Sequence, residues 1–133
     1  MGKYGDDRSS FGFEDLDVYK AACAFRRRIY KLAELLPPEE KYALAQQMRR
    51  AAVSLTSNIA EGYGRHHWQE SSQFCRQSRG SLLELVEDIN ICMDEGYASA
   101  EPLDKLKRQD ALEVLKLLNG YIAYLQKQKS ASH

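Results

Sequence analysis

The sequence lacks any long apolar run. No stretch approaches the roughly 20 consecutive apolar residues that a membrane-crossing helix needs. The segment before Phe11 is polar and glycine-rich rather than signal-like. We therefore expect a cytoplasmic protein. With 133 residues, 44% of them hydrophobic, the chain has the size and apolar content of one domain.

Cysteine is also scarce. Cys23, Cys75 and Cys92 are odd in number, widely spaced and embedded in apolar patterns, so a disulfide framework is not expected. They are predicted to be small buried residues. None lies within sequence reach of both a histidine and an orienting acid. Residues 62–65 lack the lysine and the serine or threonine of a phosphate-binding loop. The sequence thus predicts no enzyme and no cofactor.

Histidine is equally rare, at His66, His67 and His133. A di-metal centre inside a helical bundle needs inward glutamates and a Glu-x-x-His pair on each of two helices. Glu84 and Glu87 have the right spacing but no histidine partners, so solvated helix charges are the favoured interpretation. No metal is expected.

The few prolines mark ends of helical patterns, and no segment alternates strictly enough to predict a strand. Apolar residues recur every three or four positions in residues 18–36, 45–62, 68–96 and 99–125. Short connections favour antiparallel neighbours. The prediction is an all-α, up-down-up-down four-helix bundle over residues 13–126, with flexible ends at 1–12 and 127–133.

The third and fourth helical segments each carry a second apolar stripe beside the first. One bundle core does not easily absorb such wide arcs, and soluble monomers rarely expose large apolar patches. We therefore expect self-association. The predicted interface consists of Leu83, Val86, Met93, Val114, Leu117, Tyr121 and Tyr124.

The 19 basic and 19 acidic residues cancel, which argues against a uniformly cationic surface. The charges are nevertheless uneven, because basic residues outnumber acids over residues 18–79 and acids outnumber basic residues over residues 81–113. The basic part could bind phosphates or simply be a solubilising face. Candidate nucleic-acid-binding residues are Arg26, Arg27, Arg28, Lys31, Arg49, Arg50, Arg65, Arg76 and Arg79.

A polar row on the second helical segment has two open interpretations. Arg50, Ser54, Asn58 and Glu61 recur at near-helical spacing. The row could form a buried hydrogen-bond network that fixes helix packing, or it could be the wet side of the helix.

Four segments carry a family resemblance: FEDLDVY at residues 13–19, QMRRAAVS at 47–54, SNIAEGYGR at 57–65 and GSLLEL at 80–85. Together they resemble the bacterial four-helix-bundle family of 23S ribosomal RNA intervening-sequence proteins, over roughly residues 13–125. That family includes the accessory variability determinant of diversity-generating retroelements. The resemblance implies a small bundle that assembles as a homopentamer.

Retroelement members bind nucleic acid and a reverse transcriptase through basic surfaces, so the resemblance implies a homo-oligomeric adaptor for RNA or a protein–nucleic-acid complex. The alternative is a structural or protein-binding scaffold with no nucleic-acid ligand, which the neutral charge favours. The chain departs from the family at Thr56, where members often carry proline. A proline kink in the second helix is therefore absent, although hydroxyl groups near Thr56 could still bend it.

Overall fold

The structure is a computed structural model that describes residues 11–65 and 67–131, with side chains up to residue 128. Its elements, in chain order, are η1 (Phe13–Asp15), α1 (Asp17–Glu34), η2 (Pro38–Glu40), α2 (Leu44–Tyr63), α3 (Trp68–Asp94), α4 (Ala100–Lys105), η3 (Leu106–Ala111) and α5 (Leu112–Ala131). The described residues contain no strand. None of the described helices is long and apolar enough to cross a membrane.

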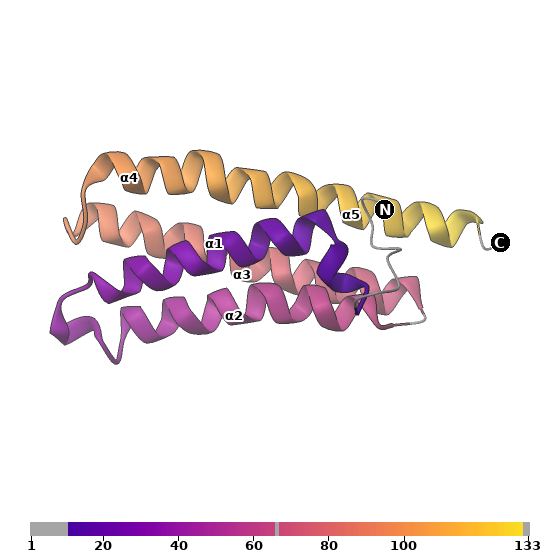
Figure 1. Cartoon of the computed structure of the whole chain (residues 1–133), viewed down its shortest axis with the longest axis horizontal. Helices are drawn as coiled ribbons and strands as arrows, with labels where there is room; N and C mark the ends of the chain where they lie inside the picture. Colours follow the sequence, from indigo (N-terminus) through magenta and orange to yellow (C-terminus); the bar gives the residue numbers. More distant parts are fainter. Residues whose placement is uncertain (1–10, 66, 132–133) are drawn as a thin grey trace.

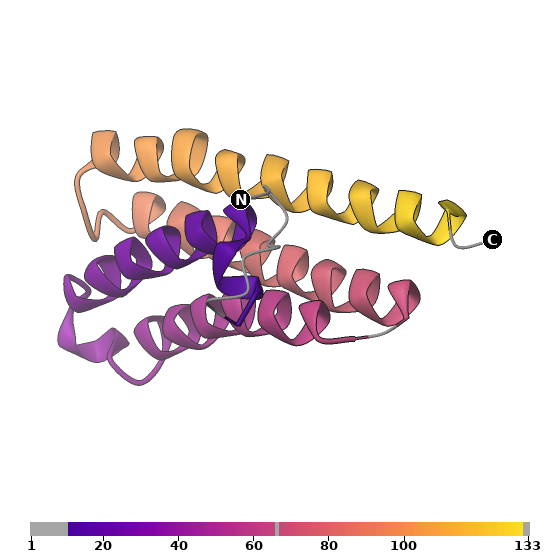
Figure 2. The same cartoon turned by 45° about the vertical axis from the view of Figure 1, so that its right-hand side comes forward.

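The long helices run alternately up and down, which confirms the predicted all-α four-helix bundle (Figures 1 and 2). α4, η3 and α5 follow one another without a break and together form the fourth rod. This rod continues to Ala131. The flexible tail from residue 127 stays a prediction. Residues 1–10 and 132–133, where flexible ends were also predicted, lie outside the described residues.

The core lies along the centre of the bundle and follows the predicted apolar spacing. Each long helix contributes fully buried side chains because its apolar residues share one face. The largest apolar ones are Phe25, Ile29, Met48, Leu55, Ile59, Leu82, Leu85, Ile89, Val114 and Leu118, and Leu16, just before α1, is also fully buried.

The helix ends follow the predicted punctuation. α1 stops at Glu34, shortly before Pro37 and Pro38, and Gly96 after α3 adopts a φ of 69°, which favours glycine. α2 is one continuous helix from Leu44 to Tyr63. Thr56 lies within it, and its hydroxyl donates to the Val53 carbonyl oxygen at 3.3 Å.

The fourth rod changes its winding at η3, which is a π-helical segment. Leu106 and Ala111, at its two ends, are five residues apart and both buried. An α-helix would rotate the second residue away from the first, whereas a wider turn keeps both against the core. π-helical turns are rare and frequently lie at functional sites.

Candidate functional site

The outer surface of α1 and α2 is basic because these two helices carry almost no acids. No aspartate or glutamate lies at residues 18–33 of α1 or at residues 44–60 of α2. The same stretches contain Lys20, Arg26, Arg27, Arg28, Lys31, Arg49 and Arg50. A local positive potential therefore exists although the whole chain is neutral.

Two arginine side chains link α1 to α2. Arg26 donates from Nη1 to the hydroxyl oxygen of the buried Thr56 at 2.6 Å. The Arg49 guanidinium carbon lies 5.9 Å from the centre of the Tyr30 ring, within cation–π range. Both side chains are half-buried, so they join the helices as well as adding charge.

Arg27 and Arg50 are two free cations of this surface. Each lies opposite the buried stripe of its helix and is exposed. Neither forms an ion pair with any described residue. We call Arg26, Arg27, Arg49 and Arg50 the α1–α2 basic face.

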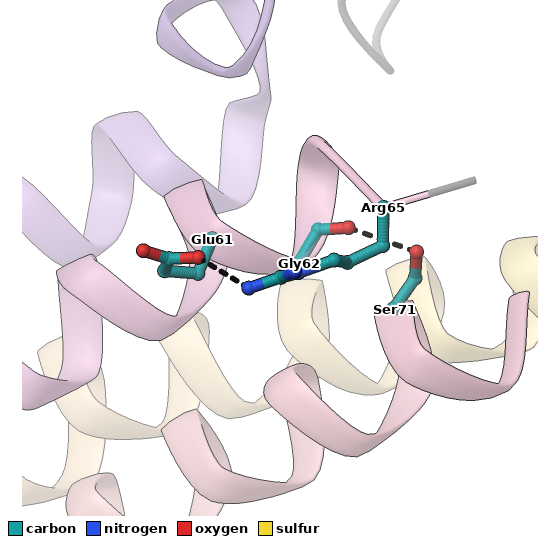
Figure 3. Close-up of polar contacts among 4 residues, drawn as sticks. All are labelled: Glu61, Gly62, Arg65 and Ser71. Atoms are coloured by element: carbon teal, nitrogen blue, oxygen red, sulfur yellow. Dashed lines mark hydrogen bonds and ion pairs between the residues drawn. The ribbon is translucent and has the colours of Figure 1, made fainter. Parts of the chain in front are cut away.

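The SNIAEGYGR segment lies at the end of α2, where this helix packs against the start of α3. Ser71 of α3 donates its hydroxyl to the Gly62 carbonyl oxygen at 2.8 Å, and Arg65 pairs with Glu61 at 2.8 Å (Figure 3). A methyl group on Gly62 would lie only 3.0 Å from Cβ of Phe74 and 3.1 Å from the Ser71 carbonyl oxygen. Gly62 is therefore required for close helix packing.

Both interpretations of the polar row on α2 apply, each to a different part of the row. The hydroxyl of Ser81 donates to Ser54 Oγ at 2.8 Å, and Asn58 donates to Ser54 Oγ at 3.0 Å. These three side chains form a part-buried network that joins α2 to α3. Arg50 and Glu61, at the two ends of the row, are exposed and belong to the wet side of the helix.

An exposed apolar patch lies between α3 and α5. Leu83 is 55% exposed and Leu112 is 46% exposed. With Val86 and Leu115, which are half-buried, they line a cavity of about 300 Å³. We call these four residues the α3–α5 apolar patch.

Three thiols and a tyrosine are buried away from these surfaces. The cysteines are free and buried, as predicted. Burial raises the pKa of Cys75 to about 12 and that of Cys92 to about 11, so both stay protonated and unreactive at neutral pH. Burial also raises the pKa of Tyr121.

The described residues contain no group of three or more His, Cys, Asp or Glu side chains that could hold a metal ion. Glu84 and Glu87 are exposed on α3. His67 precedes α3 and is exposed, whereas His66 and His133 lie outside the described residues.

Comparison with known proteins gives a family and a structural neighbour. The family model for the 23S rRNA-intervening sequence protein matches residues 14–120. That match covers most of the chain. The chain belongs to this family.

A solved structure has a similar fold to this intervening-sequence protein. It is a protein of unknown function from the S23 ribosomal protein family of Bacteroides thetaiotaomicron. The TM-score is 0.72 at 21% sequence identity, over 80% of this chain and 95% of that one. This likeness concerns the fold alone. A comparison with curated proteins gave no match.

The predicted basic residues of this intervening-sequence protein do not form one surface. Arg28 points toward η3, and its Nε lies 3.8 Å from Oδ2 of Asp110. Lys31 lies on the same side of α1. Arg79 donates to Asn119 of α5 at 2.8 Å. Arg65 lies at the α2–α3 turn, where it also covers the Phe74 ring. Arg76 is exposed on α3.

The predicted interface residues also differ in how deeply they are buried. Val114 and Tyr121 are buried within the chain, so they are not available to a neighbour. Met93, Leu117 and Tyr124 are half-buried and pack against the core. Leu83 and Val86 belong to the α3–α5 apolar patch. The other two members of the patch, Leu112 and Leu115, were not among the predicted interface residues.

Sequence reasoning also overlooked the buried carboxyl of Asp88. Its Oδ1 accepts a hydrogen bond from Gln47 Nε2 at 2.8 Å, whereas Oδ2 has no partner among the described residues. The available signal is its spacing. Asp88 follows Ser81 by seven residues and Leu85 by three, which places it on the buried side of α3.

Proposed function

We propose that the protein is a noncatalytic, homo-oligomeric adaptor that binds RNA through its α1–α2 basic face. The observation that carries this proposal is the absence of acids from most of α1 and α2, beside free arginines at Arg27 and Arg50. Phosphate contacts supply most of nonspecific nucleic-acid affinity, and they need cations that are not already paired. The family name, which refers to 23S ribosomal RNA, agrees with an RNA ligand.

Arg27→Glu together with Arg50→Glu is expected to weaken RNA binding by at least about tenfold, because both reversals act on phosphate contacts. Both side chains are exposed, so helix content should not change. The measurement is fluorescence anisotropy with labelled RNA at two salt concentrations. The wild type should lose affinity steeply as salt rises, and the double variant should show a shallower dependence.

Arg76→Glu is the matched control, because Arg76 is an exposed arginine on α3, outside the basic face. It should retain most of the RNA affinity. The same loss per reversed charge in the control and in the double variant would show that total charge, not this face, governs binding. No salt-sensitive binding by the wild type would instead favour the scaffold alternative, which agrees with the neutral net charge.

We further propose that the α3–α5 apolar patch forms the contact between subunits. Leu83 and Leu112 are large apolar side chains that water solvates poorly, so their burial would stabilise an assembly. The family resemblance implies a ring of five. A ring needs a heterologous interface, in which this patch meets a different surface of the next subunit.

Light scattering coupled to size exclusion should report a mass of about five times 15.2 kDa for the wild type. Leu83→Asp together with Leu112→Asp should raise the dissociation constant of the assembly by at least about tenfold, because charges would enter an apolar contact. Val53→Asp is the control, because Val53 is exposed on α2. A monomeric wild type would contradict the assembly, and a dimer would contradict only the ring.

A further inference from the structure

A groove separates the second half of α1 from the α4–η3 part of the fourth rod. Its volume is about 540 Å³, which lies in the range of ligand sites. Leu32, Leu103 and Leu106 form an apolar floor, and all three are buried. Leu35 stands at the edge of the groove with 67% of its surface exposed. We call this the α1–α4 groove.

The rim of the α1–α4 groove has an excess of positive charge. Arg28, Lys31 and Lys105 line it, and Asp110 is its single acidic lining residue. Asp110 lies 3.8 Å from Arg28, so its charge is partly matched. Lys31 and Lys105 are exposed and form no ion pair with any described residue. An anionic ligand would therefore meet two uncompensated ammonium groups beside an apolar surface.

The π-helical segment contributes to the shape of this groove. Gln109 and Asp110 belong to η3 and both line the groove, while Leu106 of the same segment lies on its floor. Residues three and four positions apart share one face of a helix, so this segment supplies both polar and apolar lining residues to the same cleft.

We propose that the α1–α4 groove binds an acidic amphipathic helix of a partner protein. Apolar side chains of that helix would cover the leucine floor and Leu35, and its carboxylates would lie near Lys31 and Lys105. A helix laid in an apolar groove is a recurring mode of peptide recognition. Nucleic acid fits less well, because none of the lining residues is aromatic and unpaired bases prefer to stack on aromatic rings.

The test uses the full chain labelled with ¹⁵N and a synthetic peptide of about four helical turns, with leucines on one face and glutamates beside them. The peptide should shift amide signals of residues 28–35 and 103–110, with a dissociation constant below about 1 mM. Two matched peptides carry lysine in place of glutamate or serine in place of leucine. Both should bind at least about tenfold more weakly.

Variants of the protein locate the binding. Lys31→Glu with Lys105→Glu should weaken binding of the acidic peptide by about tenfold, and Leu35→Ser should weaken it by about threefold, because these changes remove charge attraction and apolar contact respectively. Lys20→Glu with Lys116→Glu is the control, since both lysines are exposed and lie outside the groove.

Three results would overturn the proposal. The first is the absence of amide shifts at about 1 mM peptide. The second is amide shifts at residues outside the groove instead of those that line it. The third is an equal loss of peptide affinity in the groove variants and in the control variant. Labelled RNA that shifts the groove amides while the acidic peptide does not would assign the groove to nucleic acid instead.

Discussion

Gly62→Ala is expected to destabilise the protein by about 2 kcal/mol, because the added methyl group forces α2 away from α3. It would lie 3.0 Å from Cβ of Phe74 and 3.1 Å from the Ser71 carbonyl oxygen, and backbone cannot give way as a flexible side chain can. Separation would also weaken the hydrogen bond from Ser71 to Gly62. Alanine's better helix propensity offsets only about 1 kcal/mol of the lost packing and hydrogen-bond energy.

Gly80→Ala is the matched control for this substitution. Gly80 lies inside α3, is exposed, and has nothing within 4 Å of the position that a methyl group would occupy. The same change should therefore stabilise the protein by about 1 kcal/mol. Urea denaturation followed by circular dichroism measures both. If the two variants had the same sign of effect, close packing at Gly62 would not be the reason for glycine there.

This pair of glycines shows how far sequence reasoning reaches in this fold. A glycine within a helical pattern lowers helix propensity at either position, so the sequence alone does not separate Gly62 from Gly80. The family motif draws attention to Gly62 but does not explain it. The explanation is the approach of α3, which depends on the relative rotation of two helices and is not encoded in the spacing of either one.

The helices themselves were predictable because apolar spacing reports the buried face directly. The same spacing holds the signal for η3. Leu106 and Ala111 are five residues apart along the apolar seam, which an α-helix does not keep on one face. The apolar spacing on either side of this interval is α-helical, and an ordinary helix was therefore predicted there.

There is a physical reason why two of the predicted interface residues are buried within the chain. Each helix of a four-helix bundle has two neighbours, so a second apolar stripe often packs on the second neighbour rather than on another subunit. Val114 and Tyr121 are such residues, because α5 packs against both α1 and α3. By contrast, the division of the arginine triplet was predictable. Consecutive residues fan around a helix, and the structure directs Arg26 to α2 and Arg28 to η3.

The buried carboxyl of Asp88 makes stability depend on pH. Only 1% of Asp88 is exposed, and one of its oxygens has no hydrogen-bond partner among the described residues. Burial raises the pKa of Asp88 to about 6. The hydrogen bond from Gln47 lowers the pKa, and the negative charges of Glu84 and Glu87 raise it. A raised pKa means that folding favours the protonated carboxyl. The stability that depends on a protonated Asp88 is fully present below about pH 4 and is lost as the pH rises through about 6.

Asp88→Asn is therefore expected to stabilise the protein by about 2 to 3 kcal/mol at pH 8, because asparagine remains neutral where aspartate must ionise in the core. At pH 4 the difference should be small, since the aspartate is then protonated. Urea denaturation of both proteins at pH 4, 6 and 8 measures the free energy of unfolding across the titration. Glu84→Gln is the control, because this exposed neighbour should change stability only slightly. A stability gain from Asp88→Asn that is equal at all three pH values would show that packing, and not ionisation of Asp88, is responsible.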